Sequence, residues 1–337
     1  MELHALHGQE TPGGMNRMRR RLLAVAAAFA SPFGVVRASA AYPARPIRLV
    51  VPGGAGGATD AVARIPQPEA QRMLRVPIVV ENHAGAGGTI GTIETIRSAP
   101  DGYTLLVASL GTHVLRPLIV QERFDTLRDL APITRLVDVP GIVLAAPDLP
   151  VKTLHDVIEL AKSSPDPLAY GTPGVGTSAH LIAELLCART GIRLLHVPYS
   201  SSPSSYKDLM AGRLALAFSL VTGVQGHVMA GRMKAIAVTS RHRLASLPDV
   251  PTVGESGISN FDVTSWYGLM APAGTPLAVR ETVYRAFASA LREADVADRL
   301  AGIGAQVVAN SPGEFEQDLR DDFRRWADLI RRANIQR

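Results

Sequence analysis

Three glycine-rich turns could hold an anion without a charged side chain. They occupy residues 53–57, 85–88 and 171–176, and each follows a short apolar run and precedes a segment with helical spacing. Glycine lets a ligand approach the backbone closely, and the free N–H groups at the start of a helix act as fixed partial positive charge. Each turn is therefore able to bind a carboxylate or a phosphate.

Hydroxyl side chains stand beside two of these turns. Thr59 follows the first turn, and Thr177 and Ser178 follow the third. Hydroxyl groups at helix starts donate well to carboxylates and can anchor bridging waters, but each of them could equally cap its own helix. It is the convergence of three turns, and not any single residue, that favours an anion site.

Motifs for cofactor or metal binding are incomplete. Residues 174–179 fit the loose dinucleotide fingerprint G-x-G-x-x-A, but the next apolar run, 194–197, is followed by Pro198 and not by an acid. Neither a nucleotide triphosphate loop nor His-Glu-x-x-His occurs, and the single cysteine, Cys187, lies in an apolar helical run. The sequence predicts no cofactor, no metal and no disulfide within the monomer.

Ser178 and His180 invite comparison with a hydrolase. Residues two apart at a helix start do not face each other, and the chain has no Gly-x-Ser-x-Gly elbow. Binding without chemistry is therefore the leading hypothesis. An enzyme of the same shape that acts on an anionic metabolite is the alternative, and ligand-dependent stabilisation without product would separate the two.

The N-terminal segment has the order of a secretory signal peptide, predicted over residues 1–40. Four arginines within 17–21 precede the apolar run 22–30, and Ala38-Ser39-Ala40 supplies a cleavage site with small residues. The apolar run is much shorter than the roughly 20 residues needed to span a bilayer. We therefore expect export to the periplasm, by the general or the twin-arginine route.

Charge and size narrow the class further. The whole chain carries +5, but residues 1–40 hold five arginines and two glutamates, which leaves 30 basic and 28 acidic residues in the remainder. That remainder lacks a basic block interleaved with aromatic residues, which excludes nucleic acid as a partner. About 297 residues is long for a single core and natural for two lobes.

Short strand-like runs alternate with helical ones, which is typical of parallel sheets covered on both faces. The segments expected as strands are 47–51, 78–81, 104–108, 141–146, 194–197, 214–218 and 235–239. The segments expected as helices are 154–162, 179–189, 204–211, 279–293 and 312–330. In open sheets of this class ligands bind beyond the carboxyl ends of the strands, where all three glycine turns fall.

Ordered motifs along nearly the whole remainder carry a family resemblance. They lie at 42–47, 51–60, 81–88, 100–105, 176–181, 196–199, 248–252 and 266–276. On these motifs the chain resembles the substrate-binding proteins of the tripartite tricarboxylate transporter group, the Bug-type periplasmic receptors. The resemblance implies a protein, expected as a monomer, that closes on a small mono- or dicarboxylate and delivers it to membrane transporter subunits or to a sensor kinase.

The resemblance also implies a fold. It is an α/β, two-lobed periplasmic binding protein fold (type II-like), in which each lobe is a mostly parallel sheet flanked by helices. Lobe one would comprise residues 41–141 with 266–337, and lobe two residues 142–265. A two-segment hinge would join them near Gly141 and Gly268, with Trp266 buried beside the cleft.

In such receptors backbone N–H groups and ordered water from two facing turns hold one carboxylate of the ligand. Carried over, the contacts come from Gly56, Gly57 and Thr59 on lobe one and from Gly176, Thr177 and Ser178 on lobe two. The full set of candidate ligand-binding residues is Gly56, Gly57, Thr59, Asp60, Gly87, Thr112, Gly176, Thr177, Ser178, His180 and Ser219. Asp60 could instead cap its helix, and His180 could instead pack within its own lobe.

Two departures from the family pattern bear on structure and ligand. Pro66 and Pro68 fall where these receptors usually have an uninterrupted first helix, so we expect that helix to be kinked or to start late. Ser219 stands where the family often has an aspartate after a strand. Without that carboxylate, a cationic amino acid is disfavoured as the ligand.

Overall fold

The computed structural model describes residues 42–199, 201–222, 224–259 and 261–332. The signal peptide predicted over residues 1–40 lies outside them. Residues from Tyr42 onward form one compact unit. None of the helices in the described ranges is long and apolar enough to cross a membrane.

Within the described residues, ten strands form one mixed sheet in the order β2-β1-β3-β9-β4-β7-β5-β6, with β8 and β10 paired to β4. The strands are β1 (Ile47–Val51), β2 (Ile78–Asn82), β3 (Thr104–Ser109), β4 (Leu130–Ala145), β5 (Leu168–Thr172), β6 (Leu194–Pro198), β7 (Leu216–Leu220), β8 (Lys234–Val238), β9 (Thr264–Pro272) and β10 (Gln306–Val307). β1 pairs in parallel with β2 and β3, and β5 pairs in parallel with β6 and β7.

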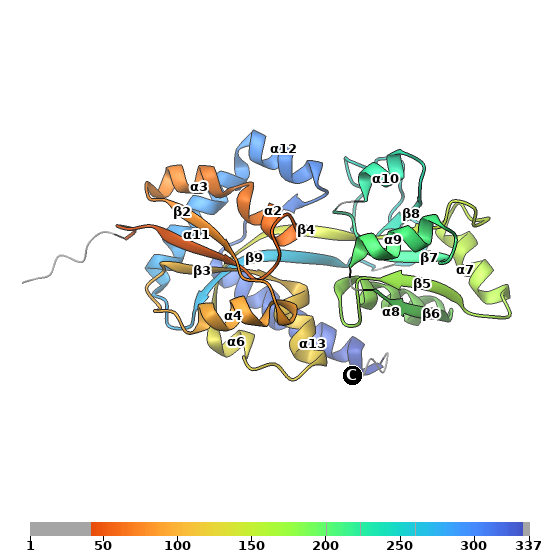
Figure 1. Ribbon diagram of the computed structural model, residues 1–337, viewed down its shortest axis with the longest axis horizontal. Helices are drawn as coiled ribbons and strands as arrows, with labels where there is room; N and C mark the ends of the chain where they lie inside the picture. Colours follow the sequence, from red (N-terminus) through yellow and green to blue (C-terminus); the bar gives the residue numbers. More distant parts are fainter. Residues whose placement is uncertain (1–41, 200, 223, 260, 333–337) are drawn as a thin grey trace, which may run out of the picture. The chain divides into compact units, whose positions relative to one another are not determined.

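Strand β4 belongs to both halves of the sheet. Its residues 130–140 pair antiparallel with β9, whereas residues 141–145 pair antiparallel with β7 and β8. The change of partner gives the two-lobed α/β arrangement that the sequence predicts (Figure 1). The predicted lobe boundary at residue 141 lies at this change and the one at residue 266 lies within β9. The boundaries themselves stay predictions.

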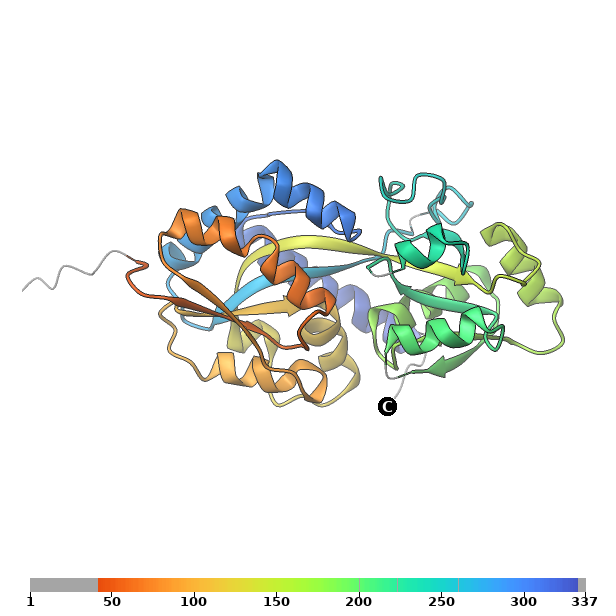
Figure 2. The same cartoon turned by 45° about the horizontal axis from the view of Figure 1, so that its top comes forward.

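Helices cover both faces of the sheet, as the two ribbon views show (Figures 1 and 2). They are α2 (Ala58–Arg64), α3 (Gln67–Leu74), α4 (Thr89–Ile96), α5 (Arg116–Ile119), α6 (Thr126–Asp129), α7 (Leu154–Ser163), α8 (Ser178–Thr190), α9 (Ser202–Met210), α10 (Gln225–Met229), α11 (Leu277–Arg292), α12 (Ala294–Gly302) and α13 (Pro312–Arg332), with the short turns η2 (Ala86–Gly88) and η3 (Gly111–Leu115). Alternate strand residues face opposite helical layers, so Leu49 and Val51 join one buried cluster and Val50 joins the other.

The sequence prediction missed β9, β10 and the first part of β4. Pro132 and Pro140 lie within β4, and a proline inside an apolar run argues against a central strand because it removes a ladder donor. The ladder accommodates Pro132 by a register shift between Pro132 and Thr134, and it uses Pro140 as an acceptor for the N–H of Val221. Both prolines thus sit in a strand that covers 16 residues.

The interruption predicted for the first helix is confirmed. α2 ends at Arg64 and α3 begins at Gln67, with a turn at Ile65 and Pro66 between them. Pro68 lies in the first turn of α3, where a helix needs no N–H donor. The two prolines therefore divide one amphipathic segment into two short helices.

Candidate functional site

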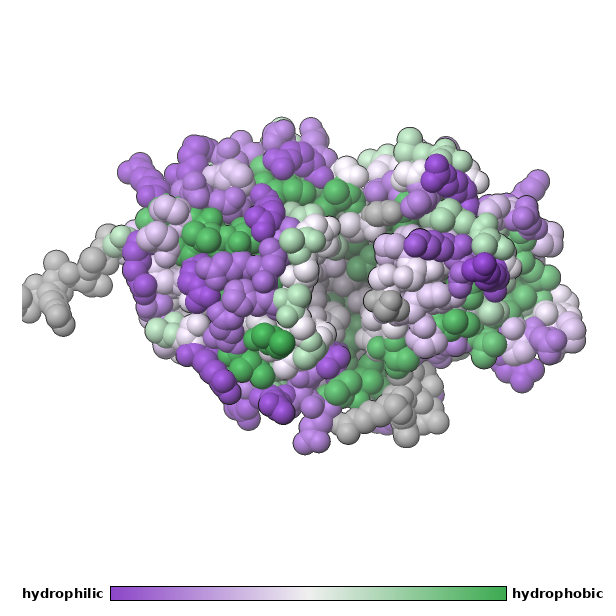
Figure 3. Space-filling view, viewed as in Figure 1, coloured by the Kyte–Doolittle hydropathy of each residue, from purple (hydrophilic) through white to green (hydrophobic). Residues whose placement is uncertain are grey.

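A cavity of about 370 Å³ lies beyond the carboxyl ends of β1, β3, β5 and β7. Its wall includes residues at the starts of four helical segments, namely Ala58, Gly111, Ser178 and Ser202. Figure 3 shows the surface hollowed between the two halves of the sheet. The position agrees with the rule that places ligands beyond the strand ends of such sheets.

Six of the eleven predicted residues line this cavity: Gly87, Thr112, Gly176, Thr177, Ser178 and Ser219. The other five, Gly56, Gly57, Thr59, Asp60 and His180, are not among its lining residues. The first glycine turn contributes only its neighbour Ala58. Convergence of the second and third turns on one cavity is thus seen, and the first turn lies at its margin.

The carboxylate of Asp60 holds the first turn together through hydrogen bonds within the protein. Its carboxylate accepts from the N–H of Gly56 at 2.9 Å, from Asn82 Nδ2 at 2.9 Å and from Arg64 Nε at 2.8 Å, and the residue is 4% exposed. Burial raises the pKa of Asp60, but these hydrogen bonds outweigh it and hold the pKa below its ordinary value. This ionised carboxylate fixes the turn and is already satisfied by protein donors.

Gly57 does not need the conformational freedom of glycine, because its φ is −76°. Gly56 does, with φ of +77°. Thr59 is a hydrogen-bonding neighbour of Tyr267, which does line the cavity. Thr59 is therefore adjacent to the cavity wall.

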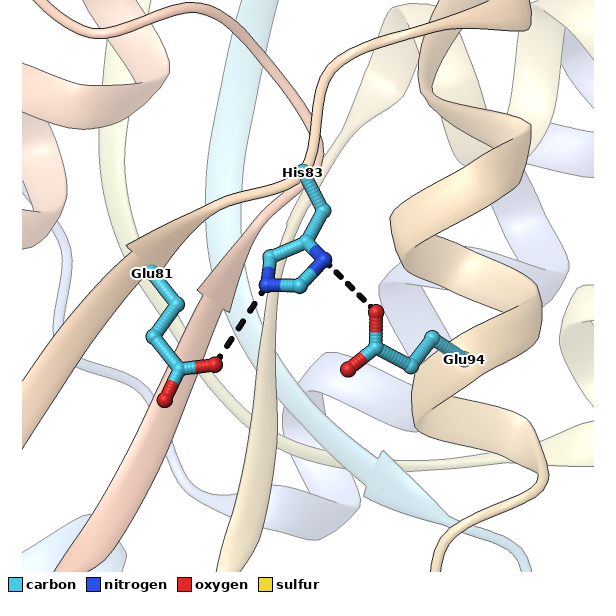
Figure 4. Close-up of side chains that lie close together, drawn as sticks. All are labelled: Glu81, His83 and Glu94. Carbon is cyan, nitrogen blue, oxygen red and sulfur yellow. Dashed lines mark hydrogen bonds and ion pairs between the residues drawn. The ribbon is translucent and has the colours of Figure 1, made fainter.

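The second turn is anchored by a charged cluster at the end of β2 (Figure 4). His83 lies between two carboxylates, with Nε2 3.3 Å from Glu81 and Nδ1 2.6 Å from Glu94. The Arg48 guanidinium contacts both carboxylates at 2.7 Å. Because the two ring nitrogens face different carboxylates and Arg48 supplies the opposing charge, this cluster is an ion network that ties β1, β2 and α4 together.

Arg116 is the one charged side chain among the described residues that line the cavity. A Cβ added to Gly87, whose φ is +65°, would lie 2.7 Å from Arg116 Nη1, so the guanidinium lies against the second turn. Arg116 is ion-paired with the buried Glu122, which also accepts from Thr89 Oγ1 at 2.9 Å. The cavity thus has a cation whose charge is largely matched, and no acid in its wall.

The helical segment from Gly111 onward is held by a buried histidine. His113 is fully buried, its Nδ1 accepts from the Ser109 N–H at 3.1 Å, and Ser109 Oγ in turn accepts from the Thr112 N–H. Its Nε2 lies 3.1 Å from Thr92 Oγ1, whose proton goes to Gly88 O, so Nε2 carries the imidazole proton. Burial lowers the pKa of His113 to about 4, which keeps the ring neutral.

In the third turn, too, a histidine ring nitrogen accepts a hydrogen bond from a backbone N–H four residues earlier. His180 Nδ1 accepts from the Gly176 N–H at 3.2 Å, and the ring stacks on His196 with centroids 4.1 Å apart. Burial lowers the pKa of His180 to about 4 as well. Thr177 caps α8 by accepting from the His180 N–H, while Ser178 and Ala179, the first residues of α8, line the cavity. The structure therefore places His180 behind the turn.

The part of the cavity wall near β7 and α9 is rich in hydroxyl groups. Ser219 lies at the end of β7 and hydrogen-bonds to the buried Tyr206, and its Oγ lies 3.5 Å from Ser202 Oγ. Thr222 lies two residues beyond β7. Sequence reasoning missed Ser109, Arg116, Ser202, Thr222, Ser265 and Tyr267, although the rule of strand ends could have indicated Ser109 and Thr222.

The two halves meet closely at the cavity. A Cβ on Gly176, whose φ is +75°, would lie 2.8 Å from Ile119 Cδ1, and one on Gly111 would lie 3.9 Å from Ser178 Oγ. The described residues that line the cavity offer neutral hydroxyl groups, the starts of helices and one ion-paired arginine, and they include no acid. Such a lining suits a small anion that is held mainly by uncharged donors.

Comparison with known proteins gives the same class. The family model described as "Tripartite tricarboxylate transporter family receptor" matches residues 62–335. BugT of Bordetella pertussis is 35% identical over 315 residues, covering 92% of this chain and 97% of BugT.

Solved structures agree. MatC from Rhodopseudomonas palustris with bound malate is 31% identical with a TM-score of 0.74, covering 86% of this chain and 100% of MatC. The R. palustris protein Rpa4515 with adipate is 29% identical with a TM-score of 0.79, covering 88% of this chain and 99% of its own. The chain therefore belongs to the tripartite tricarboxylate transporter receptor family.

Proposed function

We propose that this protein captures a small mono- or dicarboxylate in the cavity and carries it to the membrane subunits of a tripartite tricarboxylate-type transporter. One observation carries the proposal: residues at the starts of several helical segments line a cavity that contains no acidic side chain among its described lining residues. Partial positive charge from helix starts and neutral hydroxyl donors favour an anion.

We propose that the ligand carboxylate contacts the region where Thr112, Gly176 and Ser178 converge. Thr112 lines the cavity, and the N–H groups of Ser178 and Ala179 lie in the first turn of α8, which has 13 residues. Asp60 and His180 then have a supporting role, because each holds a glycine turn in place through a backbone N–H. An amine on the ligand would meet no opposing carboxylate here.

Relatives of this family are periplasmic binding proteins, and we propose the same location for this chain, with export through the signal peptide predicted at residues 1–40. We also propose that it acts as a monomer. A sensor kinase is the other recipient that the sequence leaves open. Deletion of the transporter genes would abolish uptake in the first case and leave signalling intact in the second.

Calorimetric titration with succinate, malate and adipate tests the binding proposal. We expect at least one of the three to bind the wild type and to raise its melting temperature without being converted to a product. Binding of none of them at millimolar concentration, or steady turnover of one, would contradict it.

A matched pair of glycine variants tests the site. Gly176→Ala introduces a Cβ at φ of +75° beside the cavity, and Gly191→Ala introduces one at φ of +72° where nothing lies within 4 Å. Gly191→Ala should lose about 1–2 kcal/mol of stability through backbone strain, and Gly176→Ala should lose more, because its Cβ would also lie 2.8 Å from Ile119 Cδ1. Only Gly176→Ala should weaken carboxylate binding, by about tenfold or more. Equal affinities of the two variants for the carboxylate would contradict the site assignment.

A further inference from the structure

A second cavity, of about 550 Å³, shares no lining residue with the ligand cavity. Three exposed arginines line it, Arg189, Arg241 and Arg325, and we call it the arginine cavity. Asp262 is the one acid among its described lining residues, so the lining is positively charged overall. The capture of a carboxylate in the ligand cavity gives these arginines no role.

Two of these arginines have no partner within the described part of the chain. Arg189 lies in the last turn of α8 and Arg241 lies three residues beyond β8, and neither side chain makes an ion pair or a hydrogen bond there. Arg325 is held in place, because its Nη2 donates to the Asp262 carbonyl oxygen at 2.8 Å and its guanidinium lies 5.5 Å from the centre of the Trp326 ring. Three like charges around one cavity repel one another, and an acidic group placed among them would relieve that repulsion.

The three arginines come from both halves of the molecule. Arg189 and Arg241 belong to the half that contains β5 to β8, whereas Arg325 is part of α13, which packs against η3 and α5 in the other half. A pocket for a small free ligand usually holds it with polar groups that are already fixed, but Arg189 and Arg241 are exposed and unpaired. Exposed arginines are instead enriched at protein interfaces, where a guanidinium can bind a carboxylate through two parallel hydrogen bonds.

Resting on the proposed function, we propose that the arginine cavity is a docking surface for acidic side chains on the membrane subunits of the transporter. Aspartate or glutamate side chains of the partner would pair with Arg189 and Arg241, and Arg325 would supply a third, fixed charge. Such a partner contacts both halves of the receptor at once and leaves the ligand cavity free. Complementary charges of this kind mainly speed the encounter of two proteins and fix their orientation.

Uptake of labelled malate and succinate tests the docking surface, in cells whose only copy of the receptor is the double variant Arg189→Gln/Arg241→Gln. With the receptor at limiting concentration, we expect uptake to fall about five- to tenfold, because two charges that attract the membrane subunits are lost. The purified variant should bind both ligands with wild-type affinity in calorimetry, since neither arginine lines the ligand cavity. Arg189→Lys/Arg241→Lys keeps both charges and should retain more uptake than the glutamine variant.

Arg232→Gln/Arg292→Gln is the matched control, because it removes the same net charge elsewhere. Arg232 precedes β8, at the end opposite to Arg241, and Arg292 lies in the last turn of α11 as Arg189 lies in the last turn of α8. Both control residues are exposed, have no ion pair with a described residue and do not line the arginine cavity. Uptake with this variant should equal that with the wild type.

Wild-type uptake with Arg189→Gln/Arg241→Gln would overturn the inference, and so would an equal fall in the control, which would show only an effect of net charge. Weaker ligand binding by the purified double variant would mean that the arginines act on the fold, and would overturn it too. Submillimolar binding of inorganic phosphate that the double variant lacks, with uptake unchanged, would identify a free-anion site instead. If the wild type binds carboxylates but supports no uptake, the transport part of the proposed function fails and the inference falls with it.

Discussion

The buried His113 lies in η3, behind the part of the cavity wall that Ser109 and Thr112 form, and it should make this protein lose stability in mild acid. His113 is fully buried and neutral, with Nδ1 accepting from Ser109 and Nε2 facing Thr92. Protonation of Nδ1 would replace the acceptor of that bond by a donor. Asparagine at this position keeps an acceptor for the Ser109 N–H but cannot titrate, so His113→Asn isolates the contribution of the histidine.

The sign follows from the depressed pKa. Burial lowers the pKa of His113 from 6.5 to about 4 in the folded protein, so between these values the unfolded chain binds a proton that the folded chain does not. Stability is therefore lost as the pH falls through this window. A single group of this kind costs about 2 kcal/mol between pH 7 and pH 5, and about 3 kcal/mol once the pH is below 4.

Urea unfolding at pH 7, 6 and 5 measures the effect. The wild type also carries His180 and His196, whose pKa values burial lowers to about 4, so its total loss should exceed that of His113 alone. We expect His113→Asn to lose about 2 kcal/mol less than the wild type over this range, whatever its stability at pH 7. His155→Asn, at an exposed position of α7, should behave as the wild type. The same pH dependence in His113→Asn and the wild type would refute the reasoning.

Two further predictions concern the first helix and the hinge. Pro68 is exposed in the first turn of α3, where its fixed φ suits a helix start, so Pro68→Ala should lower the free energy of unfolding by roughly 0.5–1 kcal/mol because the unfolded chain gains conformational freedom. A rise of the melting temperature in differential scanning calorimetry would contradict this. If the protein closes around its hinge, saturating malate should reduce the radius of gyration in small-angle scattering, and an unchanged radius would favour a rigid pocket. Trp266 is 1% exposed and its indole N–H donates to Asp322, so the emission of Trp266 in the Trp326→Phe variant should shift little when malate binds.

Local signals in the sequence predicted much of the fold. The runs that become β1, β2, β3 and β6 are short, apolar and followed by turn residues, so their positions follow from pattern alone. β9 has no clean alternation of apolar and polar residues, because it is buried on both faces after Thr264 and contains Gly268 and Pro272. A Cβ on Gly268 would lie 2.6 Å from Phe315 Cζ, a contact between segments far apart in the chain. Such a requirement has no local signature.

The candidate site could be predicted only in part for a similar reason. A threonine or aspartate beside a glycine turn has the same sequence signature whether it contacts a ligand or closes the turn. Asp60 closes its turn through Gly56, Asn82 and Arg64, whereas Ser178 lines the cavity. Thr222 lies in a loop whose position depends on how β7 pairs with the second part of β4. Only the assembled sheet brings that loop to the cavity.

The choice of acceptor at each turn is consistent with an anion site. Three strand-to-helix turns, namely the first and third glycine turns and the turn that follows β3, use a side chain four residues ahead as acceptor for a backbone N–H: Asp60 for Gly56, His180 for Gly176 and His113 for Ser109. The carboxylate serves the turn at the margin of the cavity, where Arg64 balances it, and neutral imidazoles serve the two segments that line the wall. A carboxylate in place of either histidine, at a separation of roughly 7 Å from a bound anion and an effective dielectric of about 20, would repel it by about 2 kcal/mol. Neutral histidines hold the same backbone geometry without that repulsion, so their low pKa values serve the affinity of the cavity as well as the fold.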